Sequence, residues 1–568
     1  MNEKFVIGRA SEEVQVHLDD GKVITGPRGA AVQDFLDVVG EDQRAPIVGA
    51  IVNKRLRELT YPIKTESTVV PITMGSADGM RIYRRSLTML LGAVFAKLFP
   101  TSVMTIDHSV SSGGYFCQVK GKELRLPEDL ELLKATMLKM VEDDLPITKK
   151  ETPLPEVIKK FEQQGDFEKI RLLNHRRKDY LVMYSIGEHS DYLQGYMVPS
   201  TKYLKWFDIE PIEGGFTLRF PRRHEPIKIL PLGNYPKLLS TFREYGDWLG
   251  KLGIDSVGAL NDATADGRIR EVVLVSEALH EQRISNIAAM IAEKKDIQIV
   301  MIAGPSCAGK TSTSRRLSIQ LLARGIQPFA LEVDNYFVDR KLTPIDENGE
   351  LDFEHIDAID RKRLSSDMEK LIGTEKVQLP KYDFKDGVSG EGDIVKLRKG
   401  QIIIVEGIHG LNPKLMDNIP EDKIFRIYIS DLTQLNLDRH NRVSTTDTRL
   451  LRRIVRDART RGYTCQETIE RWESVRRGEK RYIFPYQENA DLIFNSALVY
   501  ELAALKSLAE PLLRQVPFGS NEHIEVKRLL ALLDWFLPLD AELIPDNSLL
   551  REFIGGSILK GFKIWKRK

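Results

Sequence analysis

The sequence is poor in cysteine, and this shortage limits the chemistry that it supports. Cys117, Cys307 and Cys465 are the only cysteines in 568 residues, and they lie far apart. Three isolated cysteines build neither a disulfide framework nor a CxxC metal site. The cysteine content is therefore typical of a protein in a reducing compartment, and we expect a cytoplasmic location.

Long apolar runs and an excess of one charge are also lacking. No uncharged apolar run approaches the ~18 residues of a membrane span, and the opening stretch MNEKFVIGRASEE has no apolar signal-peptide core. The 83 Lys and Arg nearly balance the 82 Asp and Glu. The net charge therefore gives no reason to expect a membrane or nucleic acid as the main partner.

The chain is long enough for several domains, and its patterns predict a multidomain fold. Residues 1–75 alternate in a β manner around an Asp-Asp-Gly turn and continue into a short amphipathic helix, which predicts a small α+β domain. Residues 76–225 mix helices with short strands and predict a second α+β domain. Residues 226–295 predict a helical connector.

The pattern changes after residue 296, where short apolar strands alternate with helices up to residue 497. Near-continuous apolar strands of this kind are typical of a parallel sheet covered on both faces by helices. The segments predicted to be strands are IQIVMIAG, PFALEVD, QIIIVEG, IFRIYIS and ADLIFN. Residues 498–568 predict a helical extension with a basic, solvated end.

The stretch AGPSCAGKTSTSRRL (303–317) contains a phosphate-binding loop. It satisfies the pattern Gly-x-x-x-x-Gly-Lys-Ser/Thr between a predicted strand and a predicted helix. We expect Lys310 to bridge the β- and γ-phosphates of ATP and Thr311 to offer its hydroxyl to Mg²⁺. The other expected nucleotide-binding residues are Gly304, Pro305, Ser306, Cys307, Ala308, Gly309 and Ser312, with Cys307 a spacer rather than a nucleophile. The alternative is a glycine turn before a helix.

Two acidic residues end predicted strands downstream of the loop. Glu406 follows four apolar residues and is the candidate for the second metal-associated acid; the alternative is a helix-capping carboxylate. Asp334 ends another strand, a position from which a carboxylate takes the proton of an attacking hydroxyl. Its alternative role is a helix N-cap.

Arginines cluster in TRLLRRIVRDARTRG at helical spacing. One helix face therefore presents several guanidinium groups, and such a face is able to close over a transferring phosphoryl group and stabilise its charge. An exposed, salt-bridged helix is the alternative. The residues are Arg449, Arg452, Arg453 and Arg456, with Arg459 and Arg461 just beyond.

In this order, the motifs resemble the uridine kinase and phosphoribulokinase family of P-loop enzymes. The resemblance covers roughly residues 296–495 and includes VDNYF (333–337), DFEHIDAID (352–360), LPKYDF (379–384), VEGI (405–408) and RRIVRD (452–457). It implies that Asp334 is the catalytic base for a sugar 5′-hydroxyl and that Glu406 associates with the metal. It also implies that Tyr382 and Phe384 line a nucleobase pocket, that Arg453 contacts the ribose side, and that Arg456 and Arg461 belong to a phosphate lid.

The sequence departs from this family in the acceptor site. The ribose-binding Asp of the family is Glu354 here, a pocket histidine aligns with Gly387, and a lid arginine is replaced by Tyr463. The resemblance therefore supports phosphoryl transfer more strongly than it supports uridine as the acceptor.

The N-terminal third resembles the front of threonyl-tRNA synthetases, with a TGS domain of β-grasp fold followed by an editing-like domain. The positions that carry the family's zinc ligands are Arg85, Met89, Leu193 and Met197. Guanidinium, thioether and alkyl groups do not reproduce a His/Cys zinc shell. The nearby His108 and His189 are expected to be ordinary polar or packing residues.

These observations favour an ATP- and Mg²⁺-dependent nucleoside kinase, with uridine or cytidine as the first acceptor. The first alternative is a kinase for another small hydroxyl compound. The second is a nucleotide-dependent regulator whose N-terminal region binds RNA or a regulatory ligand. The resemblance to a kinase family that commonly self-associates makes a homo-oligomer an open expectation, and no membrane partner is expected.

We predict that the purified protein holds no zinc and has no deacylase activity, because the four positions lack zinc ligands. Metal analysis of the purified protein checks this. One zinc ion per chain would contradict it.

Overall fold

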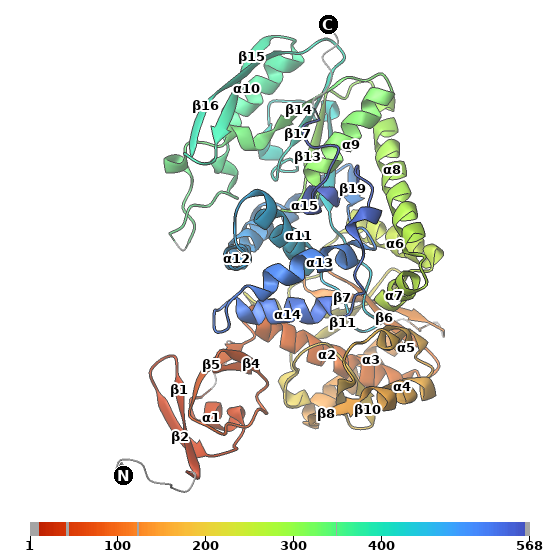
Figure 1. Cartoon of the computed structure of the whole chain (residues 1–568), viewed down its shortest axis with the longest axis vertical. Helices are drawn as coiled ribbons and strands as arrows, with labels where there is room; N and C mark the ends of the chain where they lie inside the picture. The colour runs from red at the N-terminus through yellow and green to blue at the C-terminus, as the bar shows by residue number, and fades with distance from the viewer. Residues whose placement is uncertain (1–10, 41–44, 122–123, 126, 348, 563–568) are drawn as a thin grey trace.

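The computed structural model describes residues 11–40, 45–121, 124–125, 127–347 and 349–562. Most of the opening stretch discussed above and the basic end at 563–568 lie outside these residues. Figure 1 shows the parallel sheet at one end of the molecule and the N-terminal sheets at the other, with helices between them. The multidomain α/β fold expected from the sequence is confirmed.

The first sheet has the strand order β2-β1-β5-β3-β4. Strands β1 (Glu13–Leu18) and β2 (Val23–Pro27) form the predicted hairpin, and α1 (Val32–Asp37) packs on the sheet through buried Phe35. The remaining strands are β3 (Ile47–Val52), β4 (Arg55–Arg57) and β5 (Ser67–Thr73). Strands β1 and β5 pair in parallel, and the other pairs are antiparallel.

The second region has two antiparallel sheets around the long helix α2 (Ala77–Leu98), ordered β11-β12-β7-β6 and β10-β9-β8. Fourteen residues of α2 are buried, which makes this helix the centre of that core. The strands are β6 (Val103–Ser109), β7 (Gly114–Lys120), β8 (Ile147–Pro153), β9 (Tyr180–Ile186), β10 (His189–Asp191), β11 (Asp208–Ile212) and β12 (Gly215–Arg219). The helices are α3 (Glu128–Glu142), α4 (Leu154–Gln163) and α5 (Phe167–Asn174).

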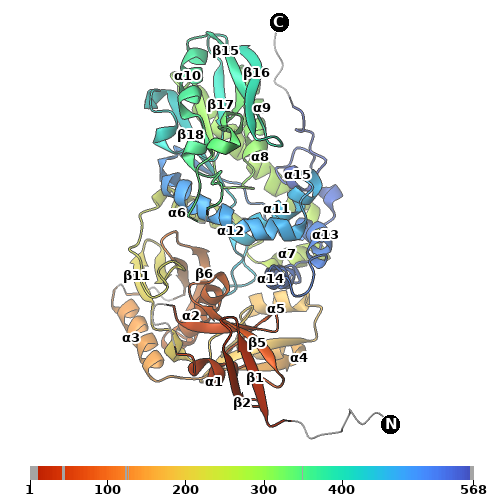
Figure 2. The same ribbon diagram turned by 90° about the vertical axis from the view of Figure 1, so that its left-hand side faces the viewer.

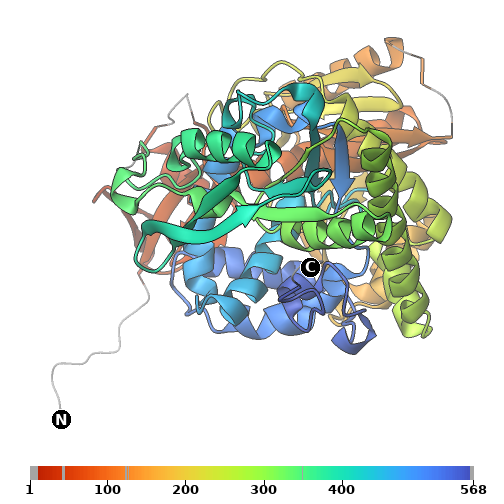
Figure 3. The ribbon, with the colours of Figure 1, turned by 90° about the horizontal axis from the view of Figure 1, so that it is seen from above.

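Helices connect this region to the parallel sheet. They are α6 (Pro236–Leu252), α7 (Val257–Ala265) and α8 (Ile269–Glu293). Helix α8 lies along α9 (Lys310–Ala323), the helix that follows the phosphate loop, and Figure 3 shows the two from above. The predicted connector is therefore part of one core with the parallel sheet.

The parallel sheet has the order β14-β17-β13-β18-β19. Its strands are β13 (Ile299–Ala303), β14 (Pro328–Glu332), β17 (Ile402–Glu406), β18 (Ile424–Ser430) and β19 (Leu492–Asn495). Because all five run the same way, the residues that follow them gather at one edge, outside the carboxyl ends of the strands. The register pairs Ile302 with Glu406, which brings the phosphate loop and this acid together.

Further elements surround this edge. Helix α10 (Arg361–Ile372) and the hairpin β15 (Lys376–Asp383) with β16 (Val388–Lys396) lie on one side. Helices α11 (Thr445–Thr460) and α12 (Cys465–Tyr482) lie on the other, and Figure 2 shows them between the parallel sheet and the N-terminal sheets.

The C-terminal extension is only partly helical. Helices α13 (Glu501–Arg514) and α14 (His523–Leu533) confirm the prediction, but beyond them the sole α-helix of the described residues is α15 (Arg551–Ile554). Helix α15 stops there because Gly555 and Gly556 have φ values of 97° and 73°, which an α-helix does not accommodate. Across the residues described, no helix combines the length and apolar character needed to span a membrane.

Arg452 on α11 joins three parts of this architecture. Its guanidinium is fully buried and donates to Glu501 Oε2 of α13 at 2.6 Å, to the Cys307 carbonyl of the phosphate loop at 3.2 Å and to the Ser496 carbonyl at 3.1 Å. One buried cation therefore fixes α11 against both the loop and the C-terminal extension.

We expect Arg452→Ala to lower the free energy of unfolding by about 3–5 kcal/mol, because it leaves Glu501 buried without its counter-charge. Chemical denaturation checks this, with Arg270→Ala on the exposed side of α8 as the matched control. Equal stability of the two variants would contradict it.

Candidate active site

The phosphate loop connects β13 to α9 in a conformation suited to binding anions. Cys307 and Gly309 adopt left-handed φ values of 60° and 86°. Alternating right- and left-handed residues turn successive backbone N–H groups toward one point and form an anion nest. The Cys307 side chain is buried, consistent with the expected spacer.

Lys310 and Thr311 open α9. The Lys310 ammonium donates to the Pro305 carbonyl at 3.3 Å, so it lies back along the loop. The Thr311 hydroxyl donates to Glu406 Oε1 at 2.7 Å. The predicted metal pair, Thr311 and Glu406, is therefore in direct contact across the sheet edge.

The environment of Glu406 fits a magnesium ion. Burial raises the pKa of this carboxyl to about 7, while Lys310 and the Thr311 hydroxyl partly oppose the shift. A carboxylate and a hydroxyl are hard oxygen ligands of the type that Mg²⁺ takes together with phosphate oxygens and water. Bound there, Mg²⁺ would neutralise charge on the donor phosphates.

Asp334 follows β14 in a short 3-10 turn, Val333–Tyr336, at the same edge. Its side chain is open to solvent. Its pKa is nevertheless raised, because the surrounding protein desolvates it, and Lys310 and Arg461 act in the opposite direction. The Asp334 carboxylate is therefore accessible and at the same time close to other protein groups.

Glu354 lies close to the same centre. Burial, reinforced by the negative charge of Glu479, raises its pKa to about 7, while Arg453 and Lys310 lower it. Its side chain packs directly over Gly478, where a larger residue would collide with it. Lys310 thus influences three acids at once, namely Glu354, Glu406 and Asp334.

An aromatic cluster forms around Phe337, which ends the 3-10 turn that carries Asp334. Phe337 is tilted against Tyr382 with ring centroids 5.5 Å apart, and Tyr382 meets Phe384 edge-on at 5.0 Å. Phe353 approaches Phe337 at 6.3 Å. Phe384 keeps 60% and Phe353 39% of its surface exposed, so the cluster presents open aromatic faces. Tyr382 and Phe384 were predicted; Phe337 and Phe353 were not assigned a role.

The arginines of α11 divide into two groups. Arg453, Arg456 and Arg461 all approach the buried carboxylate of Asp457, and Arg453 also donates to the Ser306 hydroxyl at 3.1 Å. Because these three guanidiniums share a single carboxylate, a net positive charge remains beside the phosphate loop.

Arg449 and Arg452 do not belong to an open guanidinium face, and the prediction that they do is wrong. Arg449 is 1% exposed, pairs with Glu479 and donates to the Ser306 carbonyl at 3.0 Å. Arg452 is buried against Glu501 as described above. Helical spacing put all four arginines on one side, but α12 and α13 cover half of that side.

Two contributors were missed from sequence. Glu479 on α12 accepts from the Ser306 backbone N–H at 3.1 Å as well as from Arg449 and Arg476. Arg340 lies over Gly387, so that a Cβ on this glycine would be 2.6 Å from the guanidinium carbon. Neither residue has a motif around it, because each acts across a long sequence separation.

The positions that the synthetase resemblance assigns to zinc form part of a packed core. Met89, Leu193 and Met197 are at most 6% exposed and belong to one hydrophobic cluster. Arg85 donates to the Tyr196 carbonyl at 2.7 Å, and burial lowers its pKa to about 10. The side chains fill the space with carbon, sulfur and a guanidinium, so they do not fit a zinc ion.

The two histidines near this core behave as packing residues. His108 stacks on Phe242 with ring centroids 4.0 Å apart and planes 6° apart. Burial lowers the pKa of His189 to about 4.

Comparison with known proteins finds a match for the P-loop domain and another for the N-terminal region. Residues 299–503 match the model of the Phosphoribulokinase / Uridine kinase family. The N-terminal region is similar to threonine–tRNA ligases; that of Symbiobacterium thermophilum is 28% identical over 207 residues, which are 36% of this chain and 32% of the ligase. The chain thus spans about a third of the length of the ligases that it matches.

Solved structures with low similarity include two kinases. A possible uridine kinase from Bacillus stearothermophilus is 20% identical, with 38% of this chain and 98% of that chain covered and a TM-score of 0.27. Phosphoribulokinase from Rhodobacter spheroides is 18% identical, with 35% and 70% covered and a TM-score of 0.25.

The raised pKa of Glu354 predicts a pH-dependent stability difference. In the unfolded chain this carboxyl ionises near its ordinary value of 4.5, and in the folded protein near about 7. Protonation therefore favours the folded state, and this contribution is lost as the pH rises through 7. We expect Glu354→Gln to match the wild type near pH 5 and to melt a few degrees higher near pH 8.

Thermal unfolding at the two pH values measures this difference, and Glu350→Gln, an exposed neighbour, is the matched control. A melting difference for Glu354→Gln that is the same at both pH values would contradict the assignment.

Proposed function

Since residues 299–503 form a P-loop phosphotransferase domain of the phosphoribulokinase and uridine kinase family, we propose that the protein transfers the γ-phosphoryl group of ATP to the 5′-hydroxyl of a ribonucleoside. Uridine and cytidine are the first candidates. The observation that carries this proposal is the accessible carboxylate of Asp334, which lies within electrostatic reach of Lys310 and three residues before Phe337 of the aromatic cluster.

The proposed mechanism relies on positioning and electrostatics. The phosphate-loop N–H groups and Lys310 hold the donor phosphates, and Thr311 and Glu406 would hold Mg²⁺. Asp334 accepts the proton of the attacking hydroxyl, and its raised pKa makes it a stronger base than an ordinary carboxylate. Arg453, Arg456 and Arg461 provide positive charge for the transferring group.

The aromatic cluster supports a planar acceptor. Tyr382, Phe384, Phe337 and Phe353 come from two loops and a hairpin; Phe384 and Phe353 keep exposed ring surface, whereas Tyr382 is buried. Planar heterocycles stack on such faces with a favourable contribution to binding. Glu354 would accept a hydrogen bond from a ribose hydroxyl when it is ionised.

One observation favours the alternative of another small hydroxyl acceptor. The position at which the family resemblance implies a base-reading histidine is Gly387, and the space above it belongs to Arg340, which donates to the Phe384 carbonyl at 2.7 Å. A guanidinium there presents only hydrogen-bond donors and a positive charge, so it favours an acceptor with an anionic group on that side.

We expect Asp334→Asn to lower turnover at least about a hundredfold, because general-base catalysis contributes roughly 10²–10⁴. Folding and ATP affinity should be nearly unchanged. The assay supplies ATP, Mg²⁺ and a panel of nucleosides and sugars and identifies the phosphorylated product. Asp393→Asn, an exposed residue on β16, is the control.

The products separate the candidates. A nucleoside 5′-monophosphate supports the proposal, another phosphorylated compound supports the alternative acceptor, and ATP hydrolysis or no reaction supports a nucleotide-dependent regulator. Full turnover by Asp334→Asn would refute the role of this residue.

A further inference from the structure

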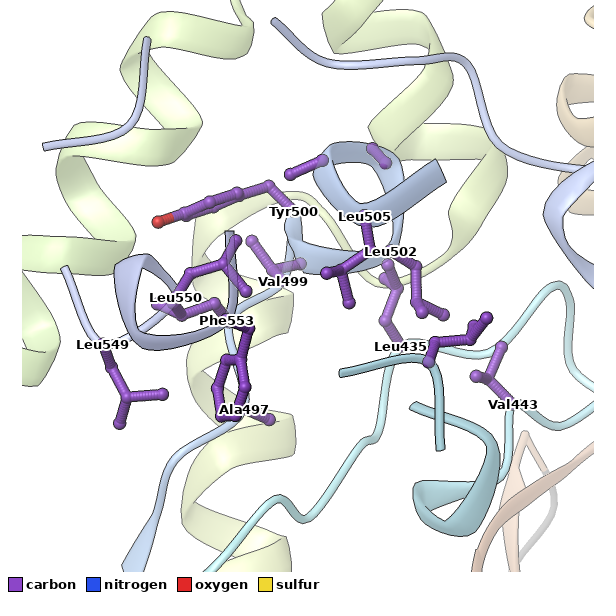
Figure 4. Packing of buried hydrophobic residues seen from close by; sticks show 14 of the residues in the cluster. Leu435, Val443, Ala497, Val499, Tyr500, Leu502, Leu505, Leu549, Leu550 and Phe553 are labelled. Atoms are coloured by element: carbon purple, nitrogen blue, oxygen red, sulfur yellow. The ribbon is translucent and has the colours of Figure 1, made fainter. Parts of the chain in front are cut away.

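A segment outside residues 299–503 lies on the phosphate loop. Residues 549–559, here called the C-terminal strap, follow α14 and include α15. Leu549, Leu550 and Phe553 of the strap are fully buried. Figure 4 shows them packed with Ala497, Val499 and Tyr500, which follow β19.

The strap is held against both helices of the donor site. Leu549 lies so close to Gly309 of the phosphate loop that a Cβ there would be 2.7 Å from a leucine methyl carbon. Arg315 of α9 donates to the Leu559 carbonyl at 3.2 Å. Arg459 of α11 donates to the carbonyls of Phe553 at 3.0 Å and Glu552 at 2.9 Å.

The side chain of Glu552 binds the first turn of α9. Its Oε2 accepts hydrogen bonds from the Ser312 hydroxyl at 2.8 Å and from the Ser312 backbone N–H at 3.2 Å. The first N–H groups of an α-helix have no partner within the helix, and in a P-loop they bind phosphate oxygens. The carboxylate of Glu552 is thus an anion bound where a phosphate of the donor would bind.

Glu552 and a phosphate oxygen cannot share this donor pair. Each accepts the same N–H and O–H, and each carries negative charge. The acid also adds to the negative potential around Glu406, the proposed metal-associated residue. A triphosphate that reaches Ser312 must therefore displace Glu552, and with it part of the strap.

We propose that the C-terminal strap is an internal competitor of the donor nucleotide, in which the carboxylate of Glu552 occupies a phosphate position at Ser312. Nucleotide binding then requires the Glu552 side chain and the part of the strap after Phe553 to leave, and this part of the strap sets the affinity for ATP. This inference rests on the proposed function, because it assumes that the phosphate loop binds a nucleoside triphosphate.

The construction of the strap is consistent with local displacement. Helix α15 has a single turn, and Gly555 and Gly556 follow it with positive φ values. Among the described residues, the side chain of Glu552 is hydrogen-bonded only to the hydroxyl and the backbone N–H of Ser312, whereas Leu549, Leu550 and Phe553 anchor the segment before the glycines. Release of the Glu552 side chain and of residues 554–559 leaves that anchor in place.

The test measures the Kd of MgATP by titration calorimetry for the wild type, Glu552→Ala, Glu542→Ala and Lys310→Ala. Glu542 lies exposed on the same extension and is the matched control. We expect Glu552→Ala to bind MgATP about tenfold more tightly than the wild type. This factor applies if, in the free wild type, the population with Glu552 bound to Ser312 is about ten times the population with Glu552 released. Glu542→Ala should match the wild type, and Lys310→Ala should bind weakly.

A second measurement uses the wild-type protein alone. Saturating MgATP should speed amide hydrogen exchange in residues 554–559, because the Gly555 and Ile558 N–H groups lose their acceptors, the carbonyls of Arg551 and Asp546. Unchanged or slower exchange would overturn the proposal, as would equal Kd values for the wild type and Glu552→Ala. If neither the wild type nor Glu552→Ala binds MgATP, the result would instead refute the proposed function and the inference with it.

Discussion

The site depends on the position of one ammonium group among three acids. Lys310 acts electrostatically on Asp334, Glu354 and Glu406, and desolvation by the surrounding protein raises the pKa of each of these carboxyls. Such an arrangement has an excess of negative groups that a divalent cation would balance. The guanidiniums of Arg453, Arg456 and Arg461 face the phosphate loop from α11. Anionic phosphates would therefore meet positive guanidiniums, and a metal cation would meet negative carboxylates.

The N-terminal region is bonded to the helix that carries those guanidiniums. Between β18 and α11, the loop 431–444 runs into the N-terminal region, where Asp438 accepts from Tyr192 and His440 pairs with Asp191 at 2.8 Å. Arg528 of α14 pairs with Asp447 at the start of α11, and Glu525 beside it pairs with Arg81 of α2. These contacts join the synthetase-like region to the start of α11.

Several features of the site could be predicted from the sequence. The phosphate loop is a contiguous motif whose backbone conformation is set by its own residues, so its position between β13 and α9 followed directly. Glu406 and Asp334 could be located because parallel strands end at a common edge. The arginines of α11 were less accessible to prediction, because helical spacing defines a face but does not reveal which neighbours cover it. Arg449 and Arg452 are buried for that reason.

The sequence by itself determined the elements whose physics is local: the anion-binding loop, the apolar parallel strands and the loss of zinc ligands at four positions. The tertiary structure alone decided what depends on distant partners. The binding of Glu552 to Ser312 joins residues 240 apart, and Arg340 fills the space over Gly387. Such contacts follow from how whole elements pack, since a side chain finds its partner through the fold and not through its neighbours in sequence.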